Sequence, residues 1–369
     1  GSGHMARGFQ QRLRGSRNGA DVDLMVTVNT ADMRDTSRRA FWQGAGWGDA
    51  AEVLLAADAS FRRYFRLKRA DGQTAIVMDA PPEKEDVRPF VAVGEILSGF
   101  GYSVPRLLAA DQTDGFLLLE DLGDITYTRA LAAGEDERAL YDLAADLLTD
   151  LAKRGLDGVA GRVPAYSDEK LLHEVMLFVD WYLRPGVGLE IDDAAREAFA
   201  DAWRACLPAV RCGADVLVLR DYHVDNIMLL PDRSGIAACG LLDFQDAVTG
   251  PASYDLVSLL QDCRRDIPQS VISSVMERYF AAMPEIADRE AFLASYRVLG
   301  AQRHFKVLGI FARQTVLYGK HGYLVHIPRL WRLALENLSD EALAPVREWI
   351  EKHVPESHRV TPPPGGCAA

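Results

Sequence analysis

The sequence has few cysteines and no apolar segment long enough for a membrane. Its 369 residues include five cysteines, an odd number, and no two of them form a Cys-x-x-Cys pair. This spacing argues against a disulfide framework and against a zinc site, and it favours a reduced, cytoplasmic chain. No apolar run approaches the ~20 residues that span a bilayer, so we expect no membrane partner.

Basic residues are also in deficit. The chain has 53 Asp and Glu against 41 Lys and Arg, which gives a formal net charge of −12. An acidic surface repels phosphate backbones, so we do not expect nucleic acid as a partner. The composition is ordinary for a globular protein, and we expect a monomer.

The two ends of the chain differ from the rest. Residues 1–34 are predicted to be a flexible leader, which opens on the cloning remnant GSGHM and lacks the apolar core of a secretory signal. Residues 356–369 contain the run PPPGG and are predicted to be a disordered tail.

Between the ends, strand signals dominate first and helical periodicity later. Short strand candidates joined by an Asp71-Gly72 turn indicate an antiparallel meander. The strand candidates of the whole chain lie at 52–56, 64–68, 75–78, 116–119, 216–219, 227–230 and 238–242. The sequence therefore predicts an α+β protein with a β-rich lobe over 35–119, a connector over 120–124 and a mainly helical lobe over 125–355.

One polar loop interrupts two apolar strand candidates, in the stretch VLVLRDYHVDNIMLL over 216–230. Asp221 and Asn226 lie in this loop, and Asp243 follows the next strand candidate. A hairpin of 227–230 with 238–242 would bring the three side chains to one end of a sheet. Such oxygen ligands suit Mg²⁺, with Asn226 and Asp243 as the metal ligands. Asp221 is then placed to accept a proton from a hydroxyl, as phosphoryl transfer requires.

The order D-x-x-x-x-N followed by D-F resembles the protein-kinase-like fold. His223 and the segment LLDFQDA (241–247) resemble the aminoglycoside phosphotransferase and choline kinase superfamily, whose segments read roughly HGDLHPGN and IDWxDA. LLLEDLGD (117–124) is similar to that superfamily's linker, whose backbone holds the adenine. The resemblance implies a two-lobe kinase-like fold that uses ATP and Mg²⁺, with Glu120 and Leu122 beside the nucleotide.

Four segments carry a closer resemblance, to the bacterial anomeric sugar kinases of cell-wall recycling. These segments are DASFRRYFRL (58–67), VMDAPPEKED (77–86), FVDWYLRP (178–185) and LRDYHVDNIM (219–228). The resemblance implies that the acceptor is an amino sugar, N-acetylmuramate or N-acetylglucosamine, phosphorylated at O1. His223, Trp181 and Tyr182 are candidate substrate contacts, since aromatic rings can stack on sugars. Packing in the core or the loop is the alternative for all three.

Two positions depart from the superfamily. Leu219 stands where relatives have a His, and Met78 stands where the third strand usually carries a Lys. Because a Met cannot neutralise phosphate, another cation is required, and an Arg fork binds phosphate well. The predicted nucleotide contacts in the preceding hairpin and its loop are Ser60, Arg62, Arg63 and Arg66.

Two other functions stay open at this point. A kinase of the same fold could act on an aminoglycoside, choline or another alcohol, although no dense acidic cluster suited to a polycationic aminoglycoside is visible. A nucleotide-binding pseudokinase would explain Met78, whereas the presence of both Asp221 and Asp243 argues for an active enzyme.

Overall fold

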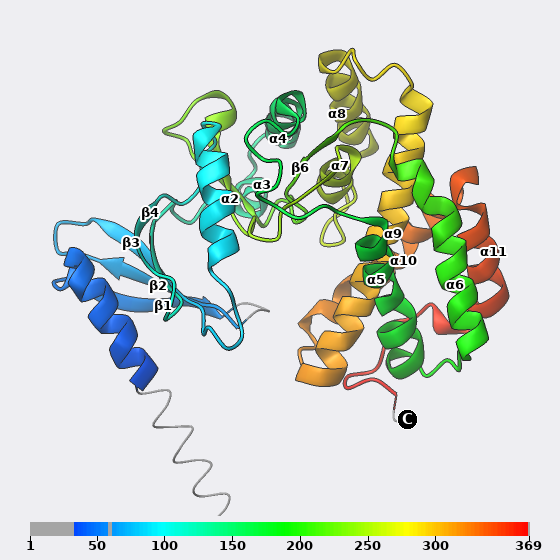
Figure 1. Ribbon diagram of the computed structural model, residues 1–369, viewed down its shortest axis with the longest axis horizontal. Helices are drawn as coiled ribbons and strands as arrows, with labels where there is room; N and C mark the ends of the chain where they lie inside the picture. The colour runs from blue at the N-terminus through cyan, green and yellow to red at the C-terminus, as the bar shows by residue number, and fades with distance from the viewer. Residues whose placement is uncertain (1–32, 58–60, 368–369) are drawn as a thin grey trace, which may run out of the picture. The chain divides into compact units, whose positions relative to one another are not determined.

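Figure 1 shows the computed structural model, which describes residues 33–57 and 61–367. Most of the predicted leader and Ser60 lie outside the described residues. The chain divides into two compact units. The first holds the described residues up to Arg88 together with Arg106–Asp121, and the second holds Pro89–Pro105 and the chain from Leu122 onward. The segment 89–105, which the sequence analysis placed in the first lobe, belongs to the second unit.

The first unit is built on a five-stranded antiparallel sheet with the order β1-β2-β3-β5-β4. Its strands are β1 (Ala51–Ala57), β2 (Arg63–Lys68), β3 (Thr74–Asp79), β4 (Leu107–Asp111) and β5 (Phe116–Glu120). The predicted turn at Asp71-Gly72 joins β2 to β3, and Gly72 takes the positive φ of 89° there. The meander predicted from the sequence is confirmed.

A helix over residues 33–42, continued by η1 (Gln43–Trp47), packs on this sheet (Figure 1). Phe65 and Leu67 alternate along β2 and point into a core that includes Trp42 and Trp47. This period of two is what a strand with one buried face requires. Residues 44–48, GAGWG, lie in η1 and the turn that follows it, and Gly46 has a positive φ there.

The second unit is mainly helical, with two small antiparallel sheets. The helices are α2 (Arg88–Gly99), α3 (Tyr127–Ala132), α4 (Glu137–Arg154), α5 (Asp168–Leu177), η2 (Phe178–Gly186), α6 (Asp193–Cys206), α7 (Ser253–Leu260), α8 (Gln269–Ala282), α9 (Arg289–Tyr318), α10 (Ile327–Leu338) and α11 (Ala344–His353). The strand pairs are β6 (Asp215–Val218) with β9 (Val248–Pro251), and β7 (Ile227–Leu229) with β8 (Cys239–Leu241). The α+β class predicted from the sequence is confirmed.

α9 is the central helix of this unit and packs against α5, α7, α10 and η2 (Figure 1). Gly309 permits its close approach to the end of α5. A Cβ at Gly309 would lie 2.3 Å from the carbonyl carbon of Leu177, far inside van der Waals contact. The approach brings the side chains of α9 and α5 into contact beside the polar loop.

The end of the chain is packed, in contrast to the predicted disordered tail. The Tyr182 hydroxyl donates to the carbonyl of Val360 at 2.6 Å, and the Cys367 N–H donates to the carbonyl of Pro185 at 2.8 Å. The composition of this segment predicts disorder, but its backbone carbonyls satisfy a buried hydroxyl. In the part of the chain that the structure describes, no helix combines the length and apolarity needed to cross a membrane.

Candidate active site

Asp221 follows β6 in a loop whose backbone is held from several sides. Buried Asp255 on α7 accepts the N–H groups of Leu219 at 2.6 Å and Arg220 at 2.9 Å. The carbonyl of Arg220 accepts from Arg303 at 2.8 Å and from the Ser258 hydroxyl at 3.2 Å. Burial raises the pKa of Asp255 to about 7, although its two N–H donors favour the carboxylate. α7 and α9 thereby fix the residue that precedes Asp221.

This region also contains two strained backbone positions. Among the described residues, Arg220 (φ 70°) and Asp243 (φ 57°) are the only ones other than glycine with a positive φ. Such conformations cost of order 1–3 kcal/mol and persist where the surroundings impose them. Asp243 is a predicted metal ligand, and Arg220 directly precedes the predicted catalytic Asp221, so both strained positions lie at the candidate site.

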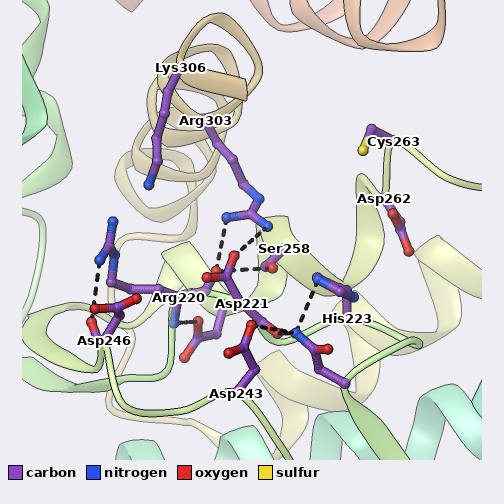
Figure 2. Close-up of polar contacts among 12 residues, drawn as sticks. Arg220, Asp221, His223, Asp243, Asp246, Ser258, Asp262, Cys263, Arg303 and Lys306 are labelled. Atoms are coloured by element: carbon purple, nitrogen blue, oxygen red, sulfur yellow. Dashed lines mark hydrogen bonds and ion pairs between the residues drawn. The ribbon is translucent and has the colours of Figure 1, made fainter. Parts of the chain in front are cut away.

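The β7–β8 hairpin brings Asn226 and Asp243 together, as predicted. The Asn226 Nδ2 group lies 3.0 Å from the Asp221 carbonyl and 3.5 Å from Asp243 Oδ2. Gln245 donates to the other oxygen of Asp243 at 2.7 Å. Figure 2 shows Asp221, Asp243 and His223 gathered around this point.

His223 is buried in the loop and uncharged. Its Nε2 accepts from Asn226 Nδ2 at 3.3 Å, and its Nδ1 is buried without a partner among the described residues. Burial, reinforced by the nearby Arg264 charge, lowers the pKa of His223 well below its ordinary value. His223 therefore acts as a neutral hydrogen-bonding group, and its predicted contact with substrate stays a prediction.

The Asp221 carboxylate is ionised because cations surround it. Partial burial alone would raise its pKa, but the charges of Arg303 and Lys306 outweigh this effect and lower the pKa to about 2. The Arg303 guanidinium lies 3.4 Å from Asp221 Oδ1. The Asp221 side chain is 39% exposed, so it remains accessible to a substrate.

The sequence analysis missed the cations that approach Asp221 from α9. Figure 2 shows Arg303 and Lys306 extending from this helix toward the loop. The Lys306 ammonium lies 3.0 Å from Glu174 on α5, which also pairs with Arg220. One signal was available: two basic residues three apart in the middle of a long helical segment. The acidic partners of Arg303 and Lys306 lie some 80 to 130 positions earlier in the chain, so this pattern could not identify them.

The donor set fits Mg²⁺. Asn226 turns its amide nitrogen toward protein acceptors, which leaves its Oδ1 for a cation next to the Asp243 carboxylate. A carboxylate and an amide oxygen, completed by waters and substrate phosphates, are the usual magnesium ligands. The described residues hold no cluster of three or more His, Cys, Asp or Glu that would suit a metal alone, so substrate oxygens would have to share the ion.

Residues 52–292 match the phosphotransferase enzyme family, abbreviated APH. The chain belongs to this family. An N-acetylmuramate/N-acetylglucosamine kinase from Caulobacter vibrioides is 37% identical over 88% of this chain and 98% of its own length. A kinase of the same name from Pseudomonas aeruginosa is 42% identical over 78% of this chain and 84% of its own. The resemblance drawn from the four sequence segments is confirmed.

A solved aminoglycoside 2'-phosphotransferase-IIIa, in its GDP complex, shares the fold. Its TM-score is 0.54 at 15% sequence identity, over 78% of this chain and 92% of that one. The likeness confirms the kinase-like fold that the D-x-x-x-x-N and D-F order predicted.

In the present chain, the arginines that were predicted to contact phosphate all have acidic partners within the first unit. Arg63 lies 2.6 Å from buried Asp79, and Arg66 lies 2.7 Å from Asp121. Arg62 forms a longer pair, 3.3 Å from Glu85. Met78 is buried in the sheet, as an apolar side chain at that position would be.

The remaining predicted contacts have different environments. Glu120 ends β5, where its carboxylate accepts the Arg106 N–H at 3.3 Å, and Leu122 packs near Gly240 in the second unit. Trp181 is half-buried in η2. Tyr182 is fully buried and stacks on Phe178 at 5.4 Å. The packing alternative thus accounts for Tyr182, because its ring and its hydroxyl are both occupied by protein.

Proposed function

We propose that this phosphotransferase moves the γ-phosphoryl group of ATP to the anomeric hydroxyl of N-acetylmuramate and N-acetylglucosamine. The products are the sugar 1-phosphate and ADP, in a step of peptidoglycan recycling. The observation that carries the proposal is the ionised, accessible Asp221 beside Asn226 and Asp243. Two relatives of 37% and 42% identity carry the name of this activity.

Asp221 would orient the acceptor hydroxyl and take its proton late. A carboxylate with a pKa near 2 is too weak a base to create an alkoxide in advance. Phosphoryl transfer through a loose transition state requires little deprotonation before bond formation, so orientation is the larger part of the task. Arg303 holds the carboxylate at 3.4 Å and keeps one oxygen aimed while the other receives the hydroxyl.

Asn226 Oδ1 and the Asp243 carboxylate would hold Mg²⁺. When bound, the ion neutralises charge on the β- and γ-phosphate oxygens. Gln245 donates to Asp243 Oδ1 at 2.7 Å, which keeps that carboxylate from rotating away.

The nucleotide would bind through the first unit and the linker at Glu120 and Leu122. The similar aminoglycoside phosphotransferase was solved with GDP, which supports a nucleotide as phosphoryl donor. We infer that one of Arg62, Arg63 and Arg66 replaces the missing strand Lys, because an arginine fork binds phosphate well.

ADP release measured over a panel of acceptors tests this proposal. N-acetylmuramate and N-acetylglucosamine should release ADP with Mg²⁺ present, whereas their methyl glycosides, in which O1 is blocked, should not. Kanamycin and choline represent the other kinases of this fold. Turnover of a methyl glycoside would refute the anomeric position, and no ADP with any acceptor would favour the pseudokinase.

A further inference from the structure

Three cations lie along one face of α9. Arg303, Lys306 and Arg313 follow one another at spacings of three and seven residues, which place side chains on the same side of a helix. Arg303 and Lys306 extend toward the Asp221 loop in Figure 2. The face is buried at Arg303 and Lys306 and becomes exposed by Leu317. It therefore leads outward from the catalytic carboxylate.

Two of these cations have protein partners, and the third has none among the described residues. Arg303 pairs with Asp221, and Lys306 pairs with Glu174. The Arg313 side chain is half-buried and makes no hydrogen bond or ion pair with any described residue, and its Nε is buried without a partner. Other arginines of this unit that are similarly covered, such as Arg264 and Arg265, each have a carboxylate.

An unpaired, half-buried guanidinium is unusual in a chain of net charge −12. Removing a charged group from water costs free energy unless an opposite charge compensates it. A helical side chain generally leans toward the N-terminus of its helix, which for Arg313 is the direction of Lys306 and Arg303. Arg303, which contacts Asp221, lies about 15 Å from Arg313 along the axis, a separation that an extended arginine side chain and one substituted sugar ring would span together.

The two proposed acceptors differ in one group. N-acetylmuramate carries a lactyl ether on O3, which ends in a carboxylate, and N-acetylglucosamine has a free hydroxyl there. With O1 at Asp221, this carboxylate projects from the far side of the ring. The planar fork of an arginine matches a carboxylate with two parallel hydrogen bonds.

We propose that Arg313 binds the lactyl carboxylate of N-acetylmuramate and sets the preference between the two sugars. This inference rests on the proposed function. Arg313 touches no reacting atom in this scheme, so its removal should alter the relative use of the two acceptors. Lys306, already paired with Glu174, acts through the charge around Asp221 and should affect both sugars alike.

The test is the ratio of kcat/KM for N-acetylmuramate to that for N-acetylglucosamine. A charge-assisted hydrogen bond contributes roughly 1.5–3 kcal/mol, so Arg313→Met should lower the ratio at least about tenfold, mainly through KM for N-acetylmuramate. Arg313→Lys should retain part of the preference. Lys306→Met should change both values by a similar factor and leave the ratio within about twofold. Arg297→Met, on the same helix but paired with Asp340 at the surface, removes one charge elsewhere and should leave the ratio unchanged.

A second measurement compares two substrates of the unmodified enzyme, so its main result does not depend on whether a variant folds. The unmodified enzyme should use N-acetylmuramate at least about tenfold better than its neutral lactyl carboxamide, and Arg313→Met should erase this difference. Equal use of acid and amide by the unmodified enzyme would overturn the proposal, as would a folded Arg313→Met variant with an unchanged ratio. If neither sugar releases ADP, the proposed function itself fails, and this outcome is distinct from ADP release without discrimination.

Discussion

Asp221 is held by charge and by backbone at the same time. Arg303 fixes one of its oxygens at 3.4 Å and also donates to the carbonyl of Arg220 at 2.8 Å. A single arginine thus supports both the strained Arg220 and the proposed catalytic Asp221. This coupling predicts that the chemistry at Asp221 can be removed without loss of the fold, whereas loss of Arg303 would disturb both.

Asp221→Asn should therefore abolish turnover while the protein stays folded. The amide is isosteric but can neither accept the hydroxyl proton nor attract Arg303 by charge. We expect kcat to fall by about 10²–10⁴ and the variant to unfold cooperatively at a somewhat lower midpoint, because buried Arg303 loses the opposite charge of Asp221. Steady-state ADP release and circular dichroism would show this. Near-normal kcat in the folded variant would mean that another residue orients the acceptor.

The pH dependence of kcat offers a second prediction at this scale. Asp221 has a lowered pKa of about 2 and His223 a pKa far below its ordinary value. Above these values Asp221 remains charged and His223 remains neutral, so neither changes its charge near neutral pH. At saturating MgATP and sugar, kcat should show no acidic limb due to either group.

His223→Gln supplies the control for this profile. A limb between pH 4 and 6.5 that disappears in the variant would show that His223 titrates in the working range. Folding lowers the pKa of Asp221. Its ionised carboxylate therefore contributes stability at pH values above its unfolded pKa of 3.8, and this contribution is lost as the pH falls through about 2.

At the scale of elements, the contact of α5 with α9 organises the cations around the loop. Gly309 lies where the two helices come closest, and the pair between Lys306 and Glu174 lies one turn away. A side chain at Gly309 would have to displace the backbone of Leu177, which cannot move independently of its helix.

Gly309→Ala should destabilise the protein although alanine favours helices. The added Cβ would meet the Leu177 carbonyl carbon at 2.3 Å, and overpacking of this kind costs about 1–3 kcal/mol, more than the roughly 1 kcal/mol gained in helix propensity. Gly99→Ala, at the end of α2 with open space around it, should be neutral or stabilising. Urea unfolding of both variants measures the contrast. Equal stabilities would show that α5 and α9 can separate at little cost.

At the scale of the whole chain, the C-terminal segment packs against residues from the middle of the sequence. The carbonyls of His358 and Val360 accept from the Tyr182 hydroxyl at 3.1 and 2.6 Å, and Trp331 donates to the same oxygen. Residues almost 180 positions apart thereby complete one aromatic core. The final segment contributes to the second unit although its composition predicts disorder.

Removal of residues 356–369 should destabilise this unit. The buried Tyr182 hydroxyl would lose both of its acceptors, and an unsatisfied buried donor costs about 1–3 kcal/mol. Denaturant unfolding of the truncated and full-length proteins gives the value. Tyr182→Phe lacks the donor, so the same truncation should cost less in that background. An equal cost in both backgrounds would show that the hydroxyl does not link the tail to the core.

The sequence by itself determined the α+β class, the meander of the first unit and the proximity of Asp221, Asn226 and Asp243. These features depend on local patterns: apolar alternation, a turn dipeptide, and polar residues at the ends of neighbouring strands in one hairpin. The family resemblance was likewise carried by short continuous segments.

Only the tertiary structure decided which residues surround Asp221. Arg303, Lys306 and Glu174 reach the loop from helices distant in sequence, and the low pKa of Asp221 arises from their charges. The positions of Tyr182 in the core and of the chain's end against it depend on the same long-range packing. Charge interactions and burial depend on distance in space, and a sequence fixes such distances only through the complete fold.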